Sequence, residues 1–311
     1  MKLIFMGTPD FAAKILEALV KGGHEIVLAV TQPDRPKGRK GEPAFSDVKQ
    51  CALRYGIPVY QPLKLRAPEA LEELEKFDAD AVVVAAFGQI LPKSVLELTE
   101  GGCINVHASL LPKYRGASPI QQAILKGEEK TGVTIMQMDE GIDTGDILLQ
   151  REVPIGREDT GGSLFEKLAR AGGELILEAL RKLGDGALKP VPQEEEKSSY
   201  ASMITKKQGL ADFGKPALVL ERMVRAFDPW PGTYTYYNGK MLKIWKASAK
   251  EGREAAPGQI LQAGKDGIEV SCKEGILVIR ELQLEGKKRM NADEFLRGCR
   301  MEEGQRLGGG D

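Results

Sequence analysis

The residues best suited to chemistry lie in one stretch, residues 103–148, which holds one of the two histidines of the 311-residue chain. His107 stands two positions after Asn105, and a turn rich in glycine and acidic residues ends the stretch. The acidic residues of this turn are Asp139, Glu140, Asp143 and Asp146. An amide can donate to a developing oxyanion, an imidazole can donate a proton or carry charge, and a carboxylate can orient the ring or relay a proton. The stretch therefore suits proton transfer at a carbonyl.

Asn105 and His107 lie on a segment with the pattern of a strand. Apolar and polar side chains alternate over residues 104–107, so Asn105 and His107 point to the same side. Residues 110–112, with the sequence Leu-Leu-Pro, end the strand, and open α/β sheets bind their ligands where strands end. A lone histidine is more often structural than catalytic, and a Gly-Asp cluster is more often a plain turn. The position of both polar side chains at a strand end nevertheless favours a site.

The elements that must position these residues alternate between strand and helix through the first half of the chain. Residues 81–86 form a near-continuous run of valine and alanine, as in a strand covered on both faces. This alternation predicts an α/β fold with a doubly wound, Rossmann-like parallel sheet. The other predicted strands are 3–6, 25–31 and 104–107, and the predicted helices are 10–21, 46–55, 68–76, 92–98, 118–126 and 161–183.

The turn after the first strand does not carry a dinucleotide-binding fingerprint. Residues 7–10, with the sequence Gly-Thr-Pro-Asp, lack the second and third glycines of that motif, and a proline occupies the turn. The sequence therefore argues against a nucleotide-dependent dehydrogenase.

The last third of the chain predicts a second domain that is rich in strands. Asn238-Gly239 separates two alternating runs, residues 233–237 and 241–245, which is a strong hairpin signal. Further strands are expected at 258–262, 267–272 and 275–284, after a helix near 216–227. Several short strands in under 100 residues suggest a small barrel. The predicted organisation is a first domain at 1–188, a linker at 189–208 and a β-domain at 209–311.

Composition narrows the class of protein further. No apolar run approaches the roughly 20 residues that span a bilayer, and the chain enters its first strand without a signal or transit peptide. The four cysteines, at 51, 103, 272 and 299, form no CxxC pair, which argues against a zinc site or a disulfide framework. Cys103 is expected to be a small buried apolar residue. A soluble cytoplasmic protein is expected, without a membrane partner.

Several spaced motifs resemble those of the folate-dependent formyltransferases. The resemblance covers roughly residues 2–300 and is carried by an Asn-x-His motif, a Ser-Leu-Leu-Pro motif and a distant aspartate. The main segments read NVHASLLPKYRGASPIQQAI and GVTIMQMDEGIDTGDIL. The supporting segments read IFMGTPDFA at 4–12, TQPDRPKGR at 31–39, AAFGQILP at 85–92 and VRAFDPWPG at 224–232.

The resemblance implies a reaction and its catalytic residues. The formyl group of the co-substrate 10-formyltetrahydrofolate would pass to the α-amine of methionine esterified to initiator tRNA, without a metal. Asn105 and His107 would hold the oxyanion, and Asp143 would pair with His107 and help to move the proton. The β-domain would be OB-like and bind the tRNA, and the protein would be a monomer.

The resemblance also implies the binding residues. The folate would lie against two segments and part of the acidic turn, although Phe87 stands where the family often has tyrosine. The implied folate-binding residues are Phe87, Gly88, Gln89, Ile90, Leu91, Ser109, Leu110, Leu111, Pro112, Asp139 and Glu140. Two basic groups would bind tRNA, although each could equally be a solvated surface charge run. They are Arg35, Lys37, Arg39 and Lys40 in one loop, and Lys287, Lys288 and Arg289 in another.

Two other functions stay open from the sequence. A formyltransferase for a small amine, such as an amino sugar nucleotide or a purine precursor, would share Asn105, His107 and Asp143. It would explain less well the basic loop and the β-domain. A catalytically silent RNA-binding module would not need the three site residues, and a folate-binding titration would separate it from an enzyme. The C-terminal part is mildly basic, since residues 206–311 carry 19 Lys and Arg against 15 Asp and Glu.

Overall fold

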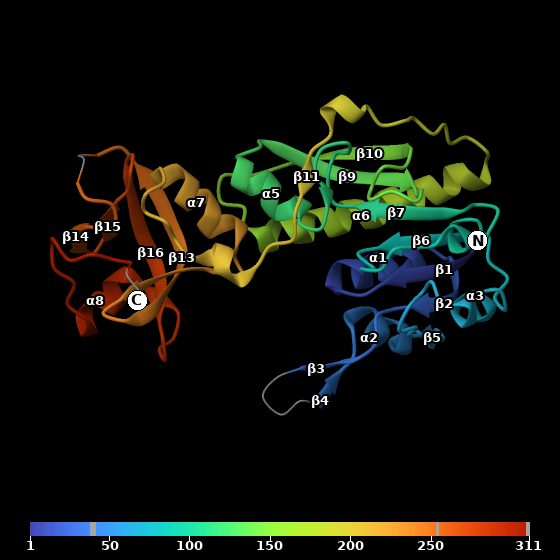
Figure 1. The fold of residues 1–311 in the computed structure, drawn as a ribbon, viewed down its shortest axis with the longest axis horizontal. Helices are drawn as coiled ribbons and strands as arrows, with labels where there is room; N and C mark the ends of the chain where they lie inside the picture. Colours follow the sequence, from blue (N-terminus) through green and yellow to red (C-terminus); the bar gives the residue numbers. More distant parts are fainter. Residues whose placement is uncertain (38–41, 253–254, 309–311) are drawn as a thin grey trace. The chain divides into compact units, whose positions relative to one another are not determined.

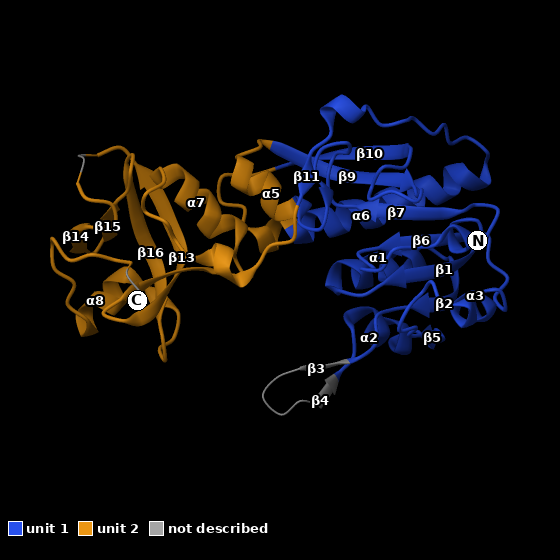
Figure 2. Ribbon diagram, viewed as in Figure 1, with its two compact units in different colours: residues 1–119, 130–154, 165–201 blue, residues 120–129, 155–164, 202–311 orange. Residues whose placement is uncertain are grey.

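A computed structural model of the protein describes residues 1–37, 42–252 and 255–308. The chain divides into two compact units (Figure 2). Unit 1 comprises residues 1–119, 130–154 and 165–201, and unit 2 comprises residues 120–129, 155–164 and 202–311. Both units are therefore assembled from segments that are separate in the sequence.

Unit 1 is built on one mixed sheet (Figure 1). In the part of the chain that the structure describes, its strand order is β10-β9-β7-β6-β1-β2-β5. The ladders among β7, β6, β1, β2 and β5 are all parallel, as predicted from the alternation of strands and helices. The strands are β1 (Lys2–Gly7), β2 (Glu25–Val30), β5 (Val59–Tyr60), β6 (Ala81–Ala85), β7 (Cys103–His107), β9 (Lys130–Gln137) and β10 (Ile147–Pro154).

The sheet departs from the predicted parallel arrangement at one edge. Strand β9 pairs antiparallel with β7, and β10 pairs antiparallel with β9. The predicted parallel sheet holds for β7, β6, β1, β2 and β5, whereas the sequence does not predict the antiparallel addition of β9 and β10. The chain between β7 and β9 turns back through a loop and one helix on to the edge of β7, so β9 runs against its neighbour. Thr134 of β9 thereby faces His107 of β7 in the register.

Helices cover both faces of this sheet. On one face, Ile4, Met6 and Val84 pack with Leu74 and Val95, which belong to α3 and α4. On the other face, α6 approaches closely, because a Cβ on its Gly172 would lie 3.0 Å from the side chain of Val106. Unit 1 contains α1 (Asp10–Lys21), α2 (Asp47–Arg54), α3 (Pro68–Leu74), α4 (Lys93–Leu96) and most of α6 (Gly161–Gly184), whereas α5 (Pro119–Lys126) belongs to unit 2 except for its first residue. All six predicted helices of the first half are confirmed, with ends shifted by a few residues.

The segment after α6 is held against unit 1, although the sequence predicts a linker there. Val191 forms an antiparallel bridge with Ile147, and β11 (Tyr200–Ala201) pairs with β8 (Arg115–Gly116). A short 3₁₀ helix, η1 (Glu195–Lys197), lies between these contacts. Proline and glutamate make the segment look solvated in sequence, but its backbone pairs with the loop that follows β7.

Unit 2 contains an antiparallel sheet, as predicted. Its order is β12-β13-β16-β15-β14, with β17 beside β16. The predicted hairpin is confirmed, since Asn238 and Gly239 both have positive φ, at 49° and 73°, between β12 and β13. The elements are η2 (Lys206–Gly209), α7 (Ala217–Ala226), β12 (Thr233–Tyr237), β13 (Lys240–Lys250), β14 (Ile260–Gly264), β15 (Gly267–Ser271), β16 (Ile276–Leu284), β17 (Met290–Asn291) and α8 (Ala292–Gly298).

The strands β3 (Arg35–Lys37) and β4 (Glu42–Ala44) form a small antiparallel pair after β2. Across the described ranges, no helix is both long and apolar enough to cross a membrane.

Candidate active site

Asn105 and His107 lie at the carboxyl end of β7, where the sequence places them. Strand β7 is covered on both faces, and the side chains of Asn105 and His107 are 8% and 6% exposed. A buried polar group needs a hydrogen-bond partner, because a lost partner costs about 1–3 kcal/mol. The partners of both side chains come from loops outside the strand.

The partner of His107 fixes which ring nitrogen can exchange a proton. The Nε2 atom lies 2.9 Å from the carbonyl oxygen of Tyr114. A carbonyl oxygen can only accept, so Nε2 carries the hydrogen and donates it. The Nδ1 atom is then the ring atom left for chemistry, and it lies 3.6 Å from Oδ2 of Asp143. The Tyr114 carbonyl thus orients the ring of His107 so that Nδ1 faces a carboxylate.

Asp143 meets both polar residues of β7 from across the sheet edge. Its Oδ1 lies 3.4 Å from Nδ2 of Asn105, and its Oδ2 accepts from the backbone N–H of Gly116 at 2.8 Å. Its φ is 55°, a left-handed conformation that costs a residue with a side chain of order 1–3 kcal/mol. The structure therefore brings together Asn105, His107 and Asp143, as the sequence predicts.

The acidic turn is braced by its own side chains. The Oδ1 atom of Asp139 accepts from Gly141 N–H at 3.0 Å and from the hydroxyl of Thr144 at 2.7 Å. A Cβ on Gly145 would lie 1.8 Å from the carbonyl oxygen of Gln137, so only glycine fits there. Asp139, predicted to bind folate, thus shapes the loop that presents Asp143, and Glu140 is exposed beside it.

The predicted folate segment after β7, residues 109–112, is held by hydrogen bonds to Thr134 of β9. The Thr134 hydroxyl donates to the carbonyl of Ser109 at 2.7 Å and accepts from Leu111 N–H at 3.1 Å. The Ser109 hydroxyl donates to the carbonyl of Lys113 at 2.6 Å. Ser109 and Leu111 are buried, whereas Leu110 and Pro112 are half-buried. Only the latter two side chains are open to a ligand.

The other predicted folate segment, residues 87–91, follows β6. Phe87 and Leu91 are buried at 3% and 5% exposure, whereas Ile90 is 78% exposed. The Gln89 amide is used within the fold, since it accepts from Leu65 N–H at 2.8 Å and donates to Pro62 at 3.3 Å. Gly88 has a φ of 80°, a left-handed conformation that favours glycine. Ile90 and the backbone at Gly88 are therefore the parts of this segment that a ligand can reach.

A cavity of about 530 Å³ opens beside this segment. It lies where β1, β2 and β6 end, and Thr8, Gln32 and Phe87 are among its lining residues. The Phe87 carbonyl accepts from the Thr8 hydroxyl and from the Gln32 amide, both at 3.2 Å. This is the edge at which open α/β sheets bind ligands, and the volume suits a small molecule.

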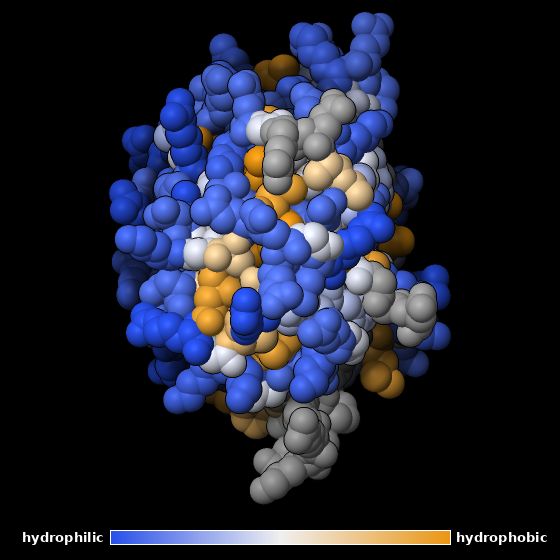
Figure 3. Space-filling model, turned by 90° about the vertical axis from the view of Figure 1, so that its left-hand side faces the viewer, coloured by the Kyte–Doolittle hydropathy of each residue, from blue (hydrophilic) through white to orange (hydrophobic). Residues whose placement is uncertain are grey.

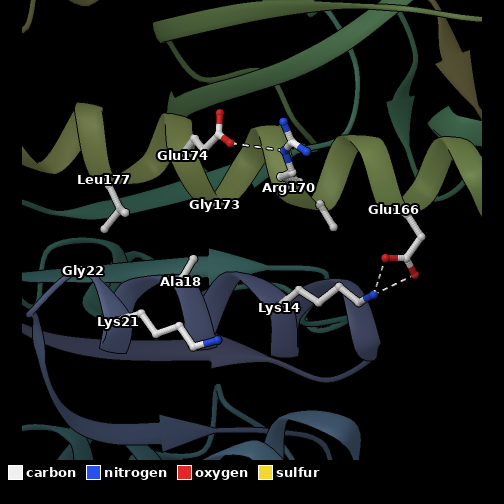
Figure 4. Close-up of a pocket in the computed structure, with 10 residues that line it drawn as sticks. Lys14, Ala18, Lys21, Gly22, Glu166, Arg170, Gly173, Glu174 and Leu177 are labelled. Atoms are coloured by element: carbon white, nitrogen blue, oxygen red, sulfur yellow. Dashed lines mark hydrogen bonds and ion pairs between the residues drawn. The ribbon is translucent and has the colours of Figure 1, made fainter.

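A second cavity, of about 420 Å³, lies between α1 and α6 (Figure 4). Its floor consists of small residues, including Ala18 and Gly173, and Lys14 donates to Glu166 at 2.6 Å at its rim. None of the predicted site residues lines it. This groove has no part in the site at the sheet edge.

The predicted tRNA contacts are only partly described by the structure. Arg39 and Lys40 lie outside the described residues, and Arg35 and Lys37 are described by their backbone alone, in strand β3. In unit 2, Lys287 and Lys288 are exposed. The face of the molecule in Figure 3 is mostly hydrophilic, with its apolar side chains in small groups.

Arg289, the last residue of the second basic group, is already engaged. Its Nη2 lies 2.6 Å from Oε2 of Glu281, and its Nη1 lies 3.8 Å from Oδ2 of Asp228. The guanidinium also lies over the Trp245 ring, 5.0 Å from its centroid. Burial raises the pKa of Asp228. Because two carboxylates share its charge, Arg289 has less to offer a phosphate than Lys287 and Lys288.

Cys103 is buried, as predicted. Its side chain is fully buried, and its Sγ donates to the carbonyl of Val95 at 3.3 Å. Burial raises the pKa of this thiol to about 12, so it is not a nucleophile.

Sequence reasoning missed two residues that support the site. Gln193, in the predicted linker, donates to the carbonyls of Asp143 and Gly145, at 2.9 and 2.7 Å. Arg115 donates from Nε and Nη2 to the side-chain amide oxygen (Oε1) of Gln193, at 3.1 and 3.0 Å. Arg115 is visible in sequence only as part of a charged loop, and nothing in the spacing marks Gln193.

Family models and curated relatives match nearly the whole chain. The family model "Formyl transferase" matches residues 1–180, and "Formyl transferase, C-terminal domain" matches residues 203–300. The methionyl-tRNA formyltransferase of Agathobacter rectalis is 50% identical over 305 residues, which cover 98% of each chain. That of Myxococcus xanthus is 50% identical over 303 residues, covering 97% of this chain and 96% of the relative.

Solved structures share the fold at lower identity. An N-formyltransferase from Helicobacter canadensis, in complex with folinic acid and dTDP-3-aminofucose, has a TM-score of 0.65 at 22% identity. The match covers 93% of this chain and 100% of that one. HypX from Aquifex aeolicus, in complex with tetrahydrofolic acid, has a TM-score of 0.64 at 19% identity and covers 95% of this chain and 47% of that one.

The two family matches and the fold, a mixed α/β sheet domain followed by an antiparallel β-domain, place the chain in the class of folate-dependent formyl transferases. Within that class the chain belongs to the methionyl-tRNA formyltransferase family, because relatives of that family match it at about half identity over nearly its full length. The resemblance predicted from the sequence motifs is confirmed.

Proposed function

We propose that the protein transfers the formyl group of 10-formyltetrahydrofolate to the α-amino group of methionyl initiator tRNA, giving N-formylmethionyl-tRNA for translation initiation. Membership of the family supports both substrates. The observation that carries the proposal for the site is that Asn105, Nδ1 of His107 and the Asp143 carboxylate converge at the carboxyl end of β7.

The residues at this edge fit the folate co-substrate. Exposed Ile90 and half-buried Leu110 and Pro112 offer apolar contacts, and the backbone at Gly88 can meet a polar ring edge. The cavity of about 530 Å³ opens beside the same segment. When bound, 10-formyltetrahydrofolate supplies the formyl carbon and the N10 leaving group.

The proposed mechanism assigns one role to each of the three side chains. The α-amine must be neutral to attack the formyl carbon, and such an amine has a pKa of about 7.7–8.0. A carbon–nitrogen bond forms, and the carbonyl oxygen becomes an oxyanion that the Asn105 amide and the His107 imidazole stabilise. Asp143 helps to move the proton from the attacking nitrogen to N10, and the carbonyl re-forms as the carbon–N10 bond breaks. The His107 atom that would act in these steps is Nδ1, because Nε2 donates to Tyr114, and Nδ1 must carry a proton when it donates to the oxyanion.

The acceptor can be tested directly against the small-amine alternative. We expect the purified protein to consume 10-formyltetrahydrofolate with charged initiator methionyl-tRNA, and not with an amino sugar nucleotide or a purine-precursor amine. A folate-binding titration in parallel would separate an enzyme from a silent RNA-binding module. Turnover with a small amine but not with the charged tRNA would replace this proposal with the alternative.

The loop after β2 is proposed to bind the acceptor end of the tRNA, with Arg39 as its main contact. Arg39→Ala should raise KM for charged tRNA, because a contact with a tRNA phosphate is lost. Folate affinity should stay unchanged, because the substitution leaves the proposed folate site unaltered. Steady-state rates at two salt concentrations would measure this, since losing one contact also flattens the salt dependence. An unchanged tRNA-dependent rate would show that the loop has another role. In the β-domain, exposed Lys287 and Lys288 are proposed as further contacts, with a smaller share for Arg289.

We further propose that the enzyme acts in the cytoplasm and as a monomer. Cell fractionation would check the first statement and analytical ultracentrifugation the second.

A further inference from the structure

Gln193 connects the two loops on which the reactive pair depends. Both hydrogens of its amide go to backbone carbonyls in the acidic turn, those of Asp143 and Gly145, at 2.9 and 2.7 Å. Its oxygen accepts from two nitrogens of Arg115, at 3.1 and 3.0 Å. A reversed amide would set its oxygen against two carbonyls and its hydrogens against a guanidinium, so the surroundings permit only one orientation.

The contact with Asp143 falls on a strained residue. Asp143 has a left-handed backbone at φ 55°, and from that backbone position its carboxylate reaches Asn105, His107 and Gly116. A residue in this region persists where its neighbours fix it. The Gln193 amide holds the carbonyl of Asp143 itself, and so opposes rotation of the peptide that aims the carboxylate.

The contact with Arg115 ties the same amide to His107. Arg115 is only 7% exposed and follows Tyr114, whose carbonyl oxygen accepts from Nε2 of His107. Glu195 forms an ion pair with Arg115, in which its Oε2 lies 2.8 Å from Nη1. One buried guanidinium is thereby fixed by two residues of the segment after α6, and it anchors the loop that sets the tautomer of His107.

We propose that Gln193 is a positioning residue for the Asp143–His107 pair, and that Glu195 supports it by holding Arg115. The inference rests on the proposed function of that pair, but it concerns a side chain that touches neither substrate nor reacting atoms. Its effect is expected in kcat, because the distance between Asp143 and His107 matters only once the substrates are bound. A misplacement of about 1 Å at such a pair costs up to about 100-fold in rate.

The test uses two replacements of similar size. Gln193→Met keeps the volume and removes all four hydrogen bonds, and Gln193→Glu keeps an acceptor for Arg115 but presents oxygens to the two carbonyls. We expect both to lower kcat by about 10- to 100-fold, with KM for folate and for tRNA changed by less than about twofold. Glu196→Met, an exposed exchange in the same segment, serves as the matched control and should keep the kcat of the unaltered enzyme.

A second readout does not need turnover. Because His24 is the only other histidine, His24→Gln assigns the imidazole resonances, and those of His107 should shift in Gln193→Met but not in Glu196→Met. Thermal unfolding of each variant reports whether the fold is intact. Full kcat and unshifted His107 resonances in Gln193→Met would overturn the proposal. An unaltered enzyme without formyl transfer to tRNA would refute the proposed function instead, while the His107 resonances would still decide on Gln193.

Discussion

Replacing Asp143 with asparagine is expected to lower kcat by roughly 10²- to 10⁴-fold, the usual size of an acid–base contribution. The replacement keeps the size of the side chain but removes its charge. Its new amide hydrogens would meet either the Asn105 amide or Gly116 N–H, both of which donate to the present carboxylate. Two donors cannot satisfy each other, so the side chain must also turn away from one partner.

Single-turnover rates with saturating folate and tRNA would measure this loss without product release. Asp185→Asn, an exposed exchange after α6 in the same unit, is a control that should keep the full rate. If Asp143→Asn retained the rate of Asp185→Asn, the carboxylate would have no part in proton movement. Its contacts would then serve only to shape the loop.

Asn105→Ala is expected to cost on the order of 10²- to 10³-fold in kcat, as the loss of one oxyanion donor does. Asn105 is buried on β7, and its Nδ2 is the donor on the side of Asp143. Asn105→Asp, of the same size, replaces that donor with an acceptor and sets a second carboxylate against Asp143. It should therefore be impaired at least as strongly as the alanine variant.

Steady-state kinetics of both Asn105 variants would separate the two possible losses. A lower kcat with unchanged KM would indicate stabilisation of the transition state alone. A higher KM for folate with unchanged kcat would contradict the oxyanion role and make Asn105 a binding residue. Because Asn105 and Asp143 are in contact, their double variant should lose less than the product of the two single effects.

Much of the fold could be predicted because its signals are local. The strand predicted at residues 81–86 is β6 (Ala81–Ala85), which is covered on both faces, and Asn238-Gly239 adopts the positive φ of a tight hairpin turn. The antiparallel edge at β9 and β10 was not predicted. The buried residues of β9 look alike in a parallel and an antiparallel strand, and direction depends on the connection.

The site was predicted in part for the same reason. The spacing of Asn105 and His107 is local, whereas Asp143 lies 38 residues after Asn105 and was assigned through family motifs. The tautomer of His107 depends on one carbonyl of Tyr114, which has a φ of 61°, and no residue type specifies that. Gln193 stands among prolines and glutamates typical of a linker. Its importance comes from contacts to loops about 50 and 78 residues away.

Formyl transfer to methionyl initiator tRNA is tested most directly by identifying the product. Purified protein, 10-formyltetrahydrofolate and charged initiator methionyl-tRNA would be incubated, and the amino acid released from the tRNA would be identified by mass spectrometry. We expect formylmethionine, which should be absent with uncharged tRNA and strongly reduced with His107→Ala. Absence of formylmethionine with folate still bound would contradict the proposed acceptor. Near-normal product with His107→Ala would contradict the proposed role of His107.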